Sequence, residues 1–76
     1  MLEKVLEILE EVTGSDEIRE DYDINLFDAG LLDSLGIIEV LLQIEEKLHI
    51  KLQPTDLERE DMATVNNLTR FLESRQ

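Results

Sequence analysis

The run from Ser34 to about His49 constrains the fold more than any other part of the chain, because it repeats apolar residues at helical spacing. Its polar positions share one arc of a helical wheel, namely Gly36, Glu39, Gln43, Glu46 and Lys47. Its apolar positions fill a much wider arc, namely Leu35, Ile37, Ile38, Val40, Leu41, Leu42, Ile44 and Leu48. Since a surface helix needs only a narrow apolar stripe, we expect a central helix packed on more than one side. Leu35 and Val40 lie at the edges of the arc, where an apolar side chain can meet a partner.

Two further segments have helical periodicity. Apolar residues from Leu2 to Val12 predict an amphipathic helix that ends near Gly14 as its C-cap. Thr64 is placed to cap a last helix. The apolar face of that last helix consists of Val65, Leu68, Phe71 and Leu72. Between them, Pro54 interrupts the chain, and the capping-box spacing of Thr55 and Glu58 predicts a short helix over residues 56–61.

Residues 15–33 form a long acidic connection without a sustained period. We expect apolar residues to pin it to the core, namely Ile18, Leu26, Phe27 and Leu31. Ordered loops of this length in compact domains are usually functional. Apart from the short stretch 49–52, nothing alternates as a strand. The predicted fold is therefore all-α, a small four-helix bundle in one domain, residues 1–76, with a long first loop and a short third helix.

The charge of the chain restricts its partners. Nineteen Asp and Glu residues outnumber seven Lys and Arg residues, which gives a net charge of −12. Such a chain is repelled by nucleic acid and by anionic membranes, whereas basic protein surfaces attract it. The charge can also serve only to keep a small protein in solution. The sequence has no apolar run long enough to cross a membrane and no signal-peptide pattern, so we expect a soluble cytoplasmic protein without direct membrane insertion.

The chain has little catalytic machinery of its own. It contains no cysteine, which excludes disulfides, zinc–thiolate sites and thiol chemistry by the polypeptide. The stretch 32–36 resembles a nucleophile elbow around Ser34, but the first glycine is missing. The single histidine, His49, lies about 20 Å farther along the same predicted helix, at 1.5 Å per residue. We therefore expect no hydrolase activity and a structural role for His49.

One acidic stretch resembles a calcium-binding loop. Asp21, Asp23 and Asn25 match the first three ligands of an EF-hand. The glycine and the bidentate glutamate that this motif requires are replaced by Leu26 and Leu32. We therefore expect no metal site there, and we expect the other carboxylates, which are spread over all segments, to be solvated.

Ser34 has two possible roles. Either it or Asp33 can cap the following helix by accepting its first free backbone N–H groups. Ser34 also lies at the positive end of that helix, where the free N–H groups and the dipole stabilise an attached phosphate. Gly36 weakens a helix by about 1 kcal/mol relative to alanine. A glycine at this place makes sense if something passes close to the backbone, although local physics leaves both roles open.

The motif Asp33-Ser34-Leu35, at the head of the second helix of a small acidic domain without cysteine, resembles the acyl and peptidyl carrier proteins. In that family the serine carries 4'-phosphopantetheine through a phosphodiester, and the thiol of this arm holds the cargo as a thioester. The resemblance implies that Ser34 is the attachment residue. It also implies that Asp33, Leu35 and Gly36 belong to the cofactor site.

Two longer runs are similar to the D-alanyl carrier proteins within that family. They are LFDAGLLDSLG, Leu26–Gly36, and LEREDMATVNNL, Leu57–Leu68. The resemblance implies a monomeric carrier that is not an enzyme. A phosphopantetheinyl transferase would attach the arm, and a D-alanine ligase would load it with D-alanine. A membrane-bound acyltransferase would then use the cargo for the D-alanylation of lipoteichoic acid in cell-wall biogenesis.

The same resemblance indicates residues that contact partners. Leu35, Glu39 and Val40 match positions that related carriers use for recognition. Gly36 departs from the fatty-acid carriers, which usually have Asp there, and this difference argues against recognition by fatty-acid enzymes. Within the family, the alternative is another acyl or peptidyl carrier. Outside it, the alternative is an unmodified acidic helical adaptor in which Ser34 only caps the helix or is phosphorylated.

Overall fold

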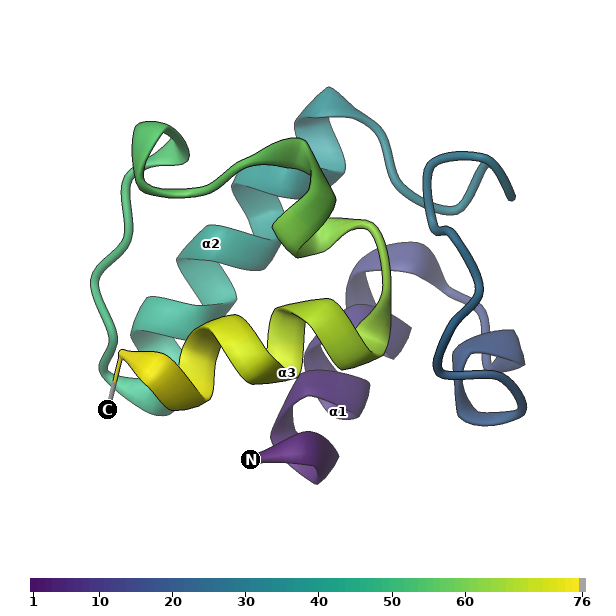
Figure 1. The fold of residues 1–76 in the computed structure, drawn as a ribbon, viewed down its shortest axis with the longest axis horizontal. Coiled ribbons are helices and arrows are strands. Elements are labelled where there is room, and N and C mark those ends of the chain that lie inside the picture. Colours follow the sequence, from purple (N-terminus) through teal and green to yellow (C-terminus); the bar gives the residue numbers. More distant parts are fainter. Residues whose placement is uncertain (76) are drawn as a thin grey trace.

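Three α-helices form the body of the molecule (Figure 1). The structure is a computed structural model that describes residues 1–75. The helices are α1 (Leu2–Thr13), α2 (Ser34–Leu48) and α3 (Val65–Ser74). Short 3-10 helices interrupt the connections, namely η1 (Glu17–Arg19), η2 (Pro54–Asp56) and η3 (Arg59–Met62). No strand occurs within residues 1–75, and none of their helices is long and apolar enough to span a membrane.

Helix α1 is the common support of the other two, because it packs against both α2 and α3. Its apolar face is buried, and it consists of Val5, Leu6, Ile8 and Leu9. The predicted C-cap is confirmed. Gly14 adopts the left-handed conformation with φ 69°, and its N–H donates to the carbonyl of Glu10 at 2.8 Å.

Helix α3 begins as the sequence predicts. The hydroxyl of Thr64 accepts a hydrogen bond from the N–H of Asn67 at 3.0 Å. Val65, Leu68 and Leu72 are fully buried and Phe71 is partly buried. The predicted apolar face of this helix is therefore the face that packs on α1.

The short helix predicted over residues 56–61 forms only as 3-10 turns, so the count of four helices is not confirmed. Leu57 is extended, with φ −120° and ψ 147°, and it separates η2 from η3. Two aspartates cap the backbone locally. Asp56 accepts the N–H of Gln53 at 2.8 Å, and Asp61 accepts that of Glu58 at 2.9 Å. These two capping boxes replace the predicted box of Thr55 with Glu58, and each stabilises only a single tight turn.

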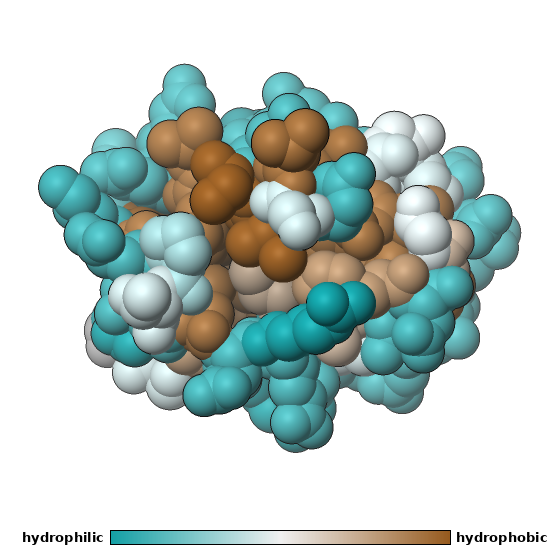
Figure 2. All heavy atoms as spheres, turned by 90° about the horizontal axis from the view of Figure 1, so that it is seen from above, coloured by the Kyte–Doolittle hydropathy of each residue, from teal (hydrophilic) through white to brown (hydrophobic). Residues whose placement is uncertain are grey.

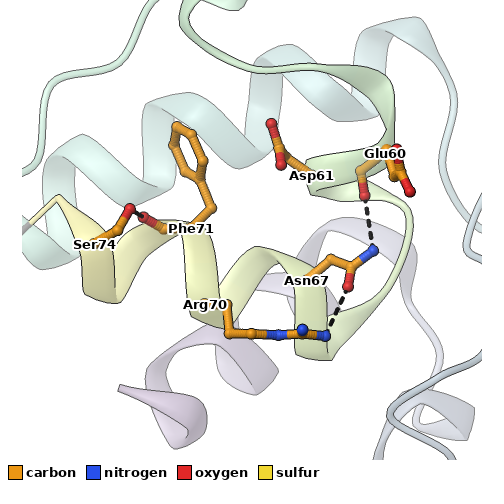
Figure 3. A pocket seen from close by; sticks show the side chains of 6 residues that line it. All are labelled: Glu60, Asp61, Asn67, Arg70, Phe71 and Ser74. Carbon is orange, nitrogen blue, oxygen red and sulfur yellow. Dashed lines mark hydrogen bonds between the residues drawn. The ribbon is translucent and has the colours of Figure 1, made fainter.

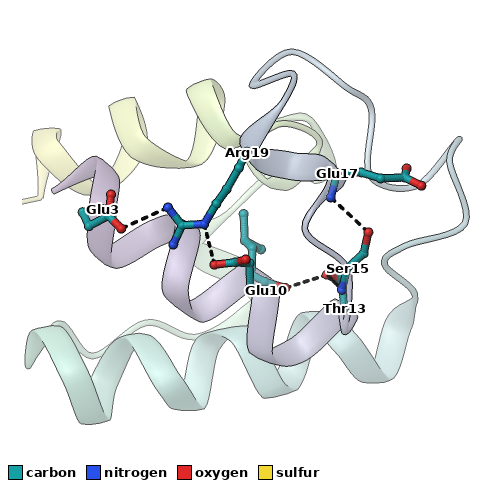
Figure 4. Close-up of polar contacts among 7 residues, drawn as sticks. Glu3, Glu10, Thr13, Ser15, Glu17 and Arg19 are labelled. Atoms are coloured by element: carbon teal, nitrogen blue, oxygen red, sulfur yellow. Dashed lines mark hydrogen bonds and ion pairs between the residues drawn. The ribbon is translucent and has the colours of Figure 1, made fainter.

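The long connection between α1 and α2 is held to the core. Ile18 and Leu26 are fully buried, and Phe27 and Leu31 are partly buried, as predicted. Figure 4 shows a further tie at η1. There the guanidinium of Arg19 bonds Glu10 at 2.7 Å and Glu3 at 3.0 Å, and these two carboxylates raise the pKa of Arg19.

Helix α2 packs against both α1 and η2, but part of its wide apolar arc stays uncovered, which corrects in part the expectation of a fully covered central helix. Its fully or nearly buried apolar residues are Val40, Leu41 and Ile44. Three other apolar residues are exposed, namely Leu35 at 75%, Ile38 at 44% and Leu42 at 60%. A view from above Figure 1, onto the start of α2 and the η2–η3 segment, shows hydrophobic side chains gathered within a hydrophilic border (Figure 2). The wide apolar arc of the sequence therefore consists of a core face and a solvent face.

Candidate attachment site

Ser34 is the first residue of α2, and its side chain is exposed. The cap of the helix is Asp33, which is extended with φ −133° and ψ −173°. The Oδ1 atom of Asp33 accepts the N–H of Gly36 at 2.8 Å. This geometry decides which of the two residues caps the helix, and it leaves the Ser34 hydroxyl without a hydrogen bond to any residue in the described part of the chain.

The other two serines differ from Ser34 in this respect. The Ser15 hydroxyl accepts the N–H of Glu17 at 3.2 Å, and the Ser74 hydroxyl donates to the carbonyl of Phe71 at 2.6 Å. Both of these hydroxyls are therefore occupied by their own backbone. Among the three serines, only Ser34 has a hydroxyl that is exposed and makes no hydrogen bond within residues 1–75.

The backbone around Ser34 fits an attached phosphodiester. Asp33 occupies two amides of the first turn, because its side chain accepts from Gly36 and its carbonyl accepts from Ile37 at 2.9 Å. The N–H groups of Ser34 and Leu35 have no hydrogen-bond partner within the described residues. They lie at the positive end of a 15-residue helix, where an anion is stabilised. A phosphate on the Ser34 oxygen would therefore lie next to two free donors.

Gly36 is buried, although it follows two exposed residues. A Cβ atom at this position would lie 2.8 Å from Cδ1 of Leu32 and 3.3 Å from Oδ1 of Asp33. The sequence suggested that something passes close to the backbone at Gly36. The structure shows that this group is the side chain of Leu32, which comes from the same chain just before the serine.

An exposed apolar stripe extends from the attachment site along α2. We define it as Leu35, Ile38 and Leu42, whose spacing of three and four residues places them on one face of the helix. Glu39 is exposed next to it. Val40, by contrast, is 0% exposed, so it cannot contact a partner as the sequence suggested. Its side chain is directed into the core, and Ile38 and Leu42 provide the accessible apolar surface instead.

Sequence reasoning did not single out Ile38 and Leu42, which the structure leaves exposed on the same face as Leu35. The sequence contained a signal for them, because the apolar arc was wider than a single packing face requires. Without the tertiary structure, nothing showed which side of that arc remains open.

A groove of about 230 Å³ lies beside the start of α2. It is lined by Ile37, Pro54, Leu57, Glu58, Arg59 and Met62. The guanidinium of Arg59 lies 4.2 Å from the centre of the Phe27 ring, within range of a cation–π interaction. This contact connects the long first loop to η3 next to the groove.

Two further hollows of the surface are lined mainly by polar residues, some of which bond to one another. In the first, of about 380 Å³, Arg70 donates to Asn67, and Asn67 donates to the carbonyl of Glu60, each at 3.0 Å (Figure 3). The bond from Asn67 to Glu60 joins α3 to η3, whereas the bond from Arg70 lies within α3. The second, of about 500 Å³, lies at the end of α1, beside the contacts of Figure 4. Both hollows therefore lie at junctions between elements, the first between η3 and α3 and the second between α1 and η1.

The stretch that resembled a calcium loop is used to form turns. Asp21 accepts the N–H of Asp23 at 2.9 Å, and Asn25 accepts those of Phe27 and Asp28 at 3.0 Å. Asp23 in turn accepts from the side chain of Asn66 at 2.7 Å. Within residues 1–75, no cluster of His, Asp and Glu is arranged to hold a metal ion. These oxygens instead cap the backbone of the loop and bind it to α3.

His49 has a backbone role at the far end of α2. It ends the helix in the left-handed conformation with φ 59°, and its N–H donates to the carbonyl of Glu45 at 3.0 Å. This fits the structural role expected for the histidine.

Comparison with known proteins agrees with this geometry. Residues 3–72 match the family described as "Phosphopantetheine attachment site". The chain is similar to the D-alanyl carrier protein of Listeria monocytogenes EGD-e, with 44% identity over 72 residues, 95% of this chain and 92% of the relative. It is also similar to the D-alanyl carrier protein of Lactococcus lactis IL1403, with 37% identity over 76 residues, 100% of this chain and 96% of the relative. That of Bacillus mycoides KBAB4 is 39% identical over 71 residues, 93% of this chain and 90% of the relative.

The family match extends from α1 through almost all of α3, so it covers the whole helical body and not only the serine motif. The family implies a covalently attached 4'-phosphopantetheine, and the free hydroxyl and free amides at the start of α2 fit such a group. The chain therefore belongs to the phosphopantetheine attachment-site family of carrier proteins.

Proposed function

We propose that this chain is a D-alanyl carrier protein whose 4'-phosphopantetheine is attached to the Ser34 oxygen. The observation that carries the proposal is the division of roles at the start of α2. Asp33 caps the helix, and the hydroxyl of Ser34 remains exposed and unbonded. The names of the relatives support D-alanine as the cargo.

The residues of this chain hold and present the arm. The oxygen of Ser34 would form the phosphodiester, and the N–H groups of Ser34 and Leu35 would stabilise its charge. When bound, the arm supplies a thiol that can hold an aminoacyl group, which this cysteine-free chain cannot supply itself. The protein is accordingly a carrier and not an enzyme.

The stripe and the charge indicate how partners dock. Leu35, Ile38 and Leu42 provide an apolar contact next to Ser34, and the net charge of −12 attracts basic surfaces. We assign this surface to a phosphopantetheinyl transferase, a D-alanine ligase and a membrane-bound acyltransferase of lipoteichoic acid D-alanylation. We assign the carrier to the cytoplasm, because the proposed loading would draw on ATP and coenzyme A. A carrier that visits several enzymes needs contacts weak enough to release each one.

Intact mass spectrometry tests the attachment. The wild-type chain is incubated with coenzyme A and a phosphopantetheinyl transferase, and it should gain the mass of one phosphopantetheine. Ser34→Ala should abolish the gain, whereas the control Ser74→Ala should retain it. A wild-type chain that stays unmodified with several transferases would overturn the proposal.

The cargo is tested next with the loaded carrier, ATP and a D-alanine ligase. D-alanine should become attached and L-alanine should not. Loading with fatty acids by their own ligases, together with failure with D-alanine, would instead assign the chain to another branch of the carrier family.

A further inference from the structure

The segment that leads into Ser34 is fixed by a relay of backbone hydrogen bonds. The carbonyl of Ala63, just before α3, accepts the N–H of Leu26 at 2.7 Å. The carbonyl of Leu26 then accepts two amides, those of Leu31 at 2.9 Å and Leu32 at 3.1 Å. Leu32 is therefore held through Leu26 to the part of the chain that begins α3.

The relay ends in a side-chain contact with the helix that bears the serine. Leu32 is only 5% exposed and belongs to the hydrophobic core. Its Cδ1 atom lies so close to Gly36 that a Cβ atom there would approach it to 2.8 Å. Real Cβ atoms almost never lie this close to another heavy atom, so any side chain at position 36 must displace Leu32. The side chain of Leu32 thus occupies the space that a side chain at position 36 would need, and Ser34 lies between the two residues in the chain.

We propose that Leu32 and Gly36 are positioning residues for the loading of Ser34: their size match fixes the first turn of α2 against residues 31–33 and so sets where the serine oxygen is presented. The inference rests on the proposed attachment at Ser34. Neither residue touches the arm in this assignment; both act through the serine. Alanine normally favours a helix over glycine, so a glycine here has to be explained by contact and not by helix propensity.

The displaced atom would be the end of a side chain and not backbone, so Gly36→Ala should fold. Leu32 should shift and carry residues 33 and 34 with it. Small misplacements of a reacting group strongly reduce rate, and we expect kcat for transfer of the arm to fall about tenfold. KM should change less than about twofold, because the apolar stripe and Glu39 are unchanged.

The test measures initial loading rates of the full chain with coenzyme A and a phosphopantetheinyl transferase over a range of carrier concentrations. A second substitution, Leu32→Val, should make room for the new methyl group. The double variant should recover the wild-type kcat to within about threefold, as expected for two residues in direct contact. Leu41→Val is the matched control, because Leu41 is also 5% exposed in the same core but lies farther along α2.

The outcomes separate positioning from a general loss of stability. If Leu32→Val restores the kcat of Gly36→Ala and Leu41→Val does not, the positioning role of Leu32 and Gly36 is supported. Wild-type loading by Gly36→Ala, or equal rescue by both valine variants, would overturn it. If Gly36→Ala does not fold, the loading rates of the two single valine variants are compared instead. Each variant is then assayed at the same interval below its own melting temperature. Slower loading by Leu32→Val than by Leu41→Val supports the positioning role, and equal loading rates reject it.

The same experiment distinguishes this inference from the proposed function. A wild-type chain that never gains the arm removes the proposed function and the inference with it. A wild-type chain that loads normally, beside a Gly36→Ala variant that loads equally well, removes only the inference.

Discussion

The two apolar faces of α2 both consist of aliphatic residues, but one is buried and the other is exposed. Val40, Leu41 and Ile44 are at most 5% exposed, whereas Leu35, Ile38 and Leu42 are at least 44% exposed. Each face is a row of aliphatic residues at helical spacing. The inner face meets α1, and nothing in residues 1–75 covers the outer one. A helix can thus carry more apolar surface than its own core needs, and in this molecule the surplus lies directly beside Ser34.

A charge on the inner face should have the largest effect. Val40→Asp places a carboxylate in a site with 0% exposure, at a cost of at least about 3 kcal/mol. A domain of this size has only about 4 to 11 kcal/mol of stability in total. We therefore expect circular dichroism to show a loss of most of the cooperative thermal transition. A native-like melting curve would mean that α2 does not pack through Val40.

The same charge on the outer face should leave the fold intact. Ile38→Asp and Leu42→Asp change exposed positions, where substitutions usually alter stability by less than about 0.5 kcal/mol. We expect melting temperatures within about 4 °C of wild type. Charging by the D-alanine ligase should nevertheless slow about tenfold, because an apolar contact at the centre of a docking surface is lost. Wild-type charging by both variants would show that partners dock elsewhere.

A change of the charge at the edge of the stripe should have a smaller effect. Glu39→Lys should reduce the association rate with a basic partner several-fold at low salt, and the loss should shrink at about 1 M salt, where the Debye length is about 3 Å. Glu7→Lys on α1 is the control, since Glu7 is exposed but lies on another helix. Stopped-flow kinetics measures both. A larger effect at Glu7 than at Glu39 would place the docking surface on α1.

A substitution on the polar side of α2 should have the smallest effect, and this effect should vanish at high pH. Lys47 bonds Glu11 of α1 at 2.9 Å, and this hydrogen bond raises the pKa of Lys47 above its ordinary value of 10.5. A raised pKa in the folded state means that the pair stabilises the fold below pH 10.5 and ceases to do so as the pH rises through the folded-state pKa. The urea midpoint of wild type should therefore exceed that of Lys47→Met slightly at pH 8. The difference should disappear once the pH has risen above the folded-state pKa of Lys47. A difference that persists there would point to packing of the lysine stem instead.

Local sequence signals were sufficient for the helix ends. Gly14 and Thr64 stop and start helices through their own backbone and side-chain chemistry, so α1 and α3 could be predicted closely. The segment around Leu57 could not. The predicted box of Thr55 with Glu58 competes there with two other boxes, Gln53 with Asp56 and Glu58 with Asp61. Both of these form, and they divide the segment into η2 and η3.

The sequence also contained a signal for the candidate attachment site. The motif around Ser34 is visible in the sequence alone. The choice between Asp33 and Ser34 as the cap needed only the local backbone geometry. The proposed docking face could be identified only from the tertiary structure. A helical wheel placed Val40 at the edge of the apolar arc, but the position of α1 decides that Val40 is covered and Ile38 is not. The relation of Leu32 to Gly36 likewise depends on how the loop returns to the helix.

The ties between the first loop and the start of α3 also bear on the order in which the molecule folds. Asp23 and Asn66, which share a 2.7 Å hydrogen bond, are 43 residues apart in the chain. The N–H of Asn66 also donates to the carbonyl of Tyr22 at 3.2 Å, and Leu26 bonds Ala63. Contacts between distant residues carry a larger loop-closure entropy, so we expect them to form after the local helical turns. During synthesis, a chain that has emerged only through α2 contains Ser34 but not the residues that fix the segment before it. The position of the Ser34 hydroxyl is therefore fixed only after the residues at the start of α3 have been synthesised and have bonded to the first loop.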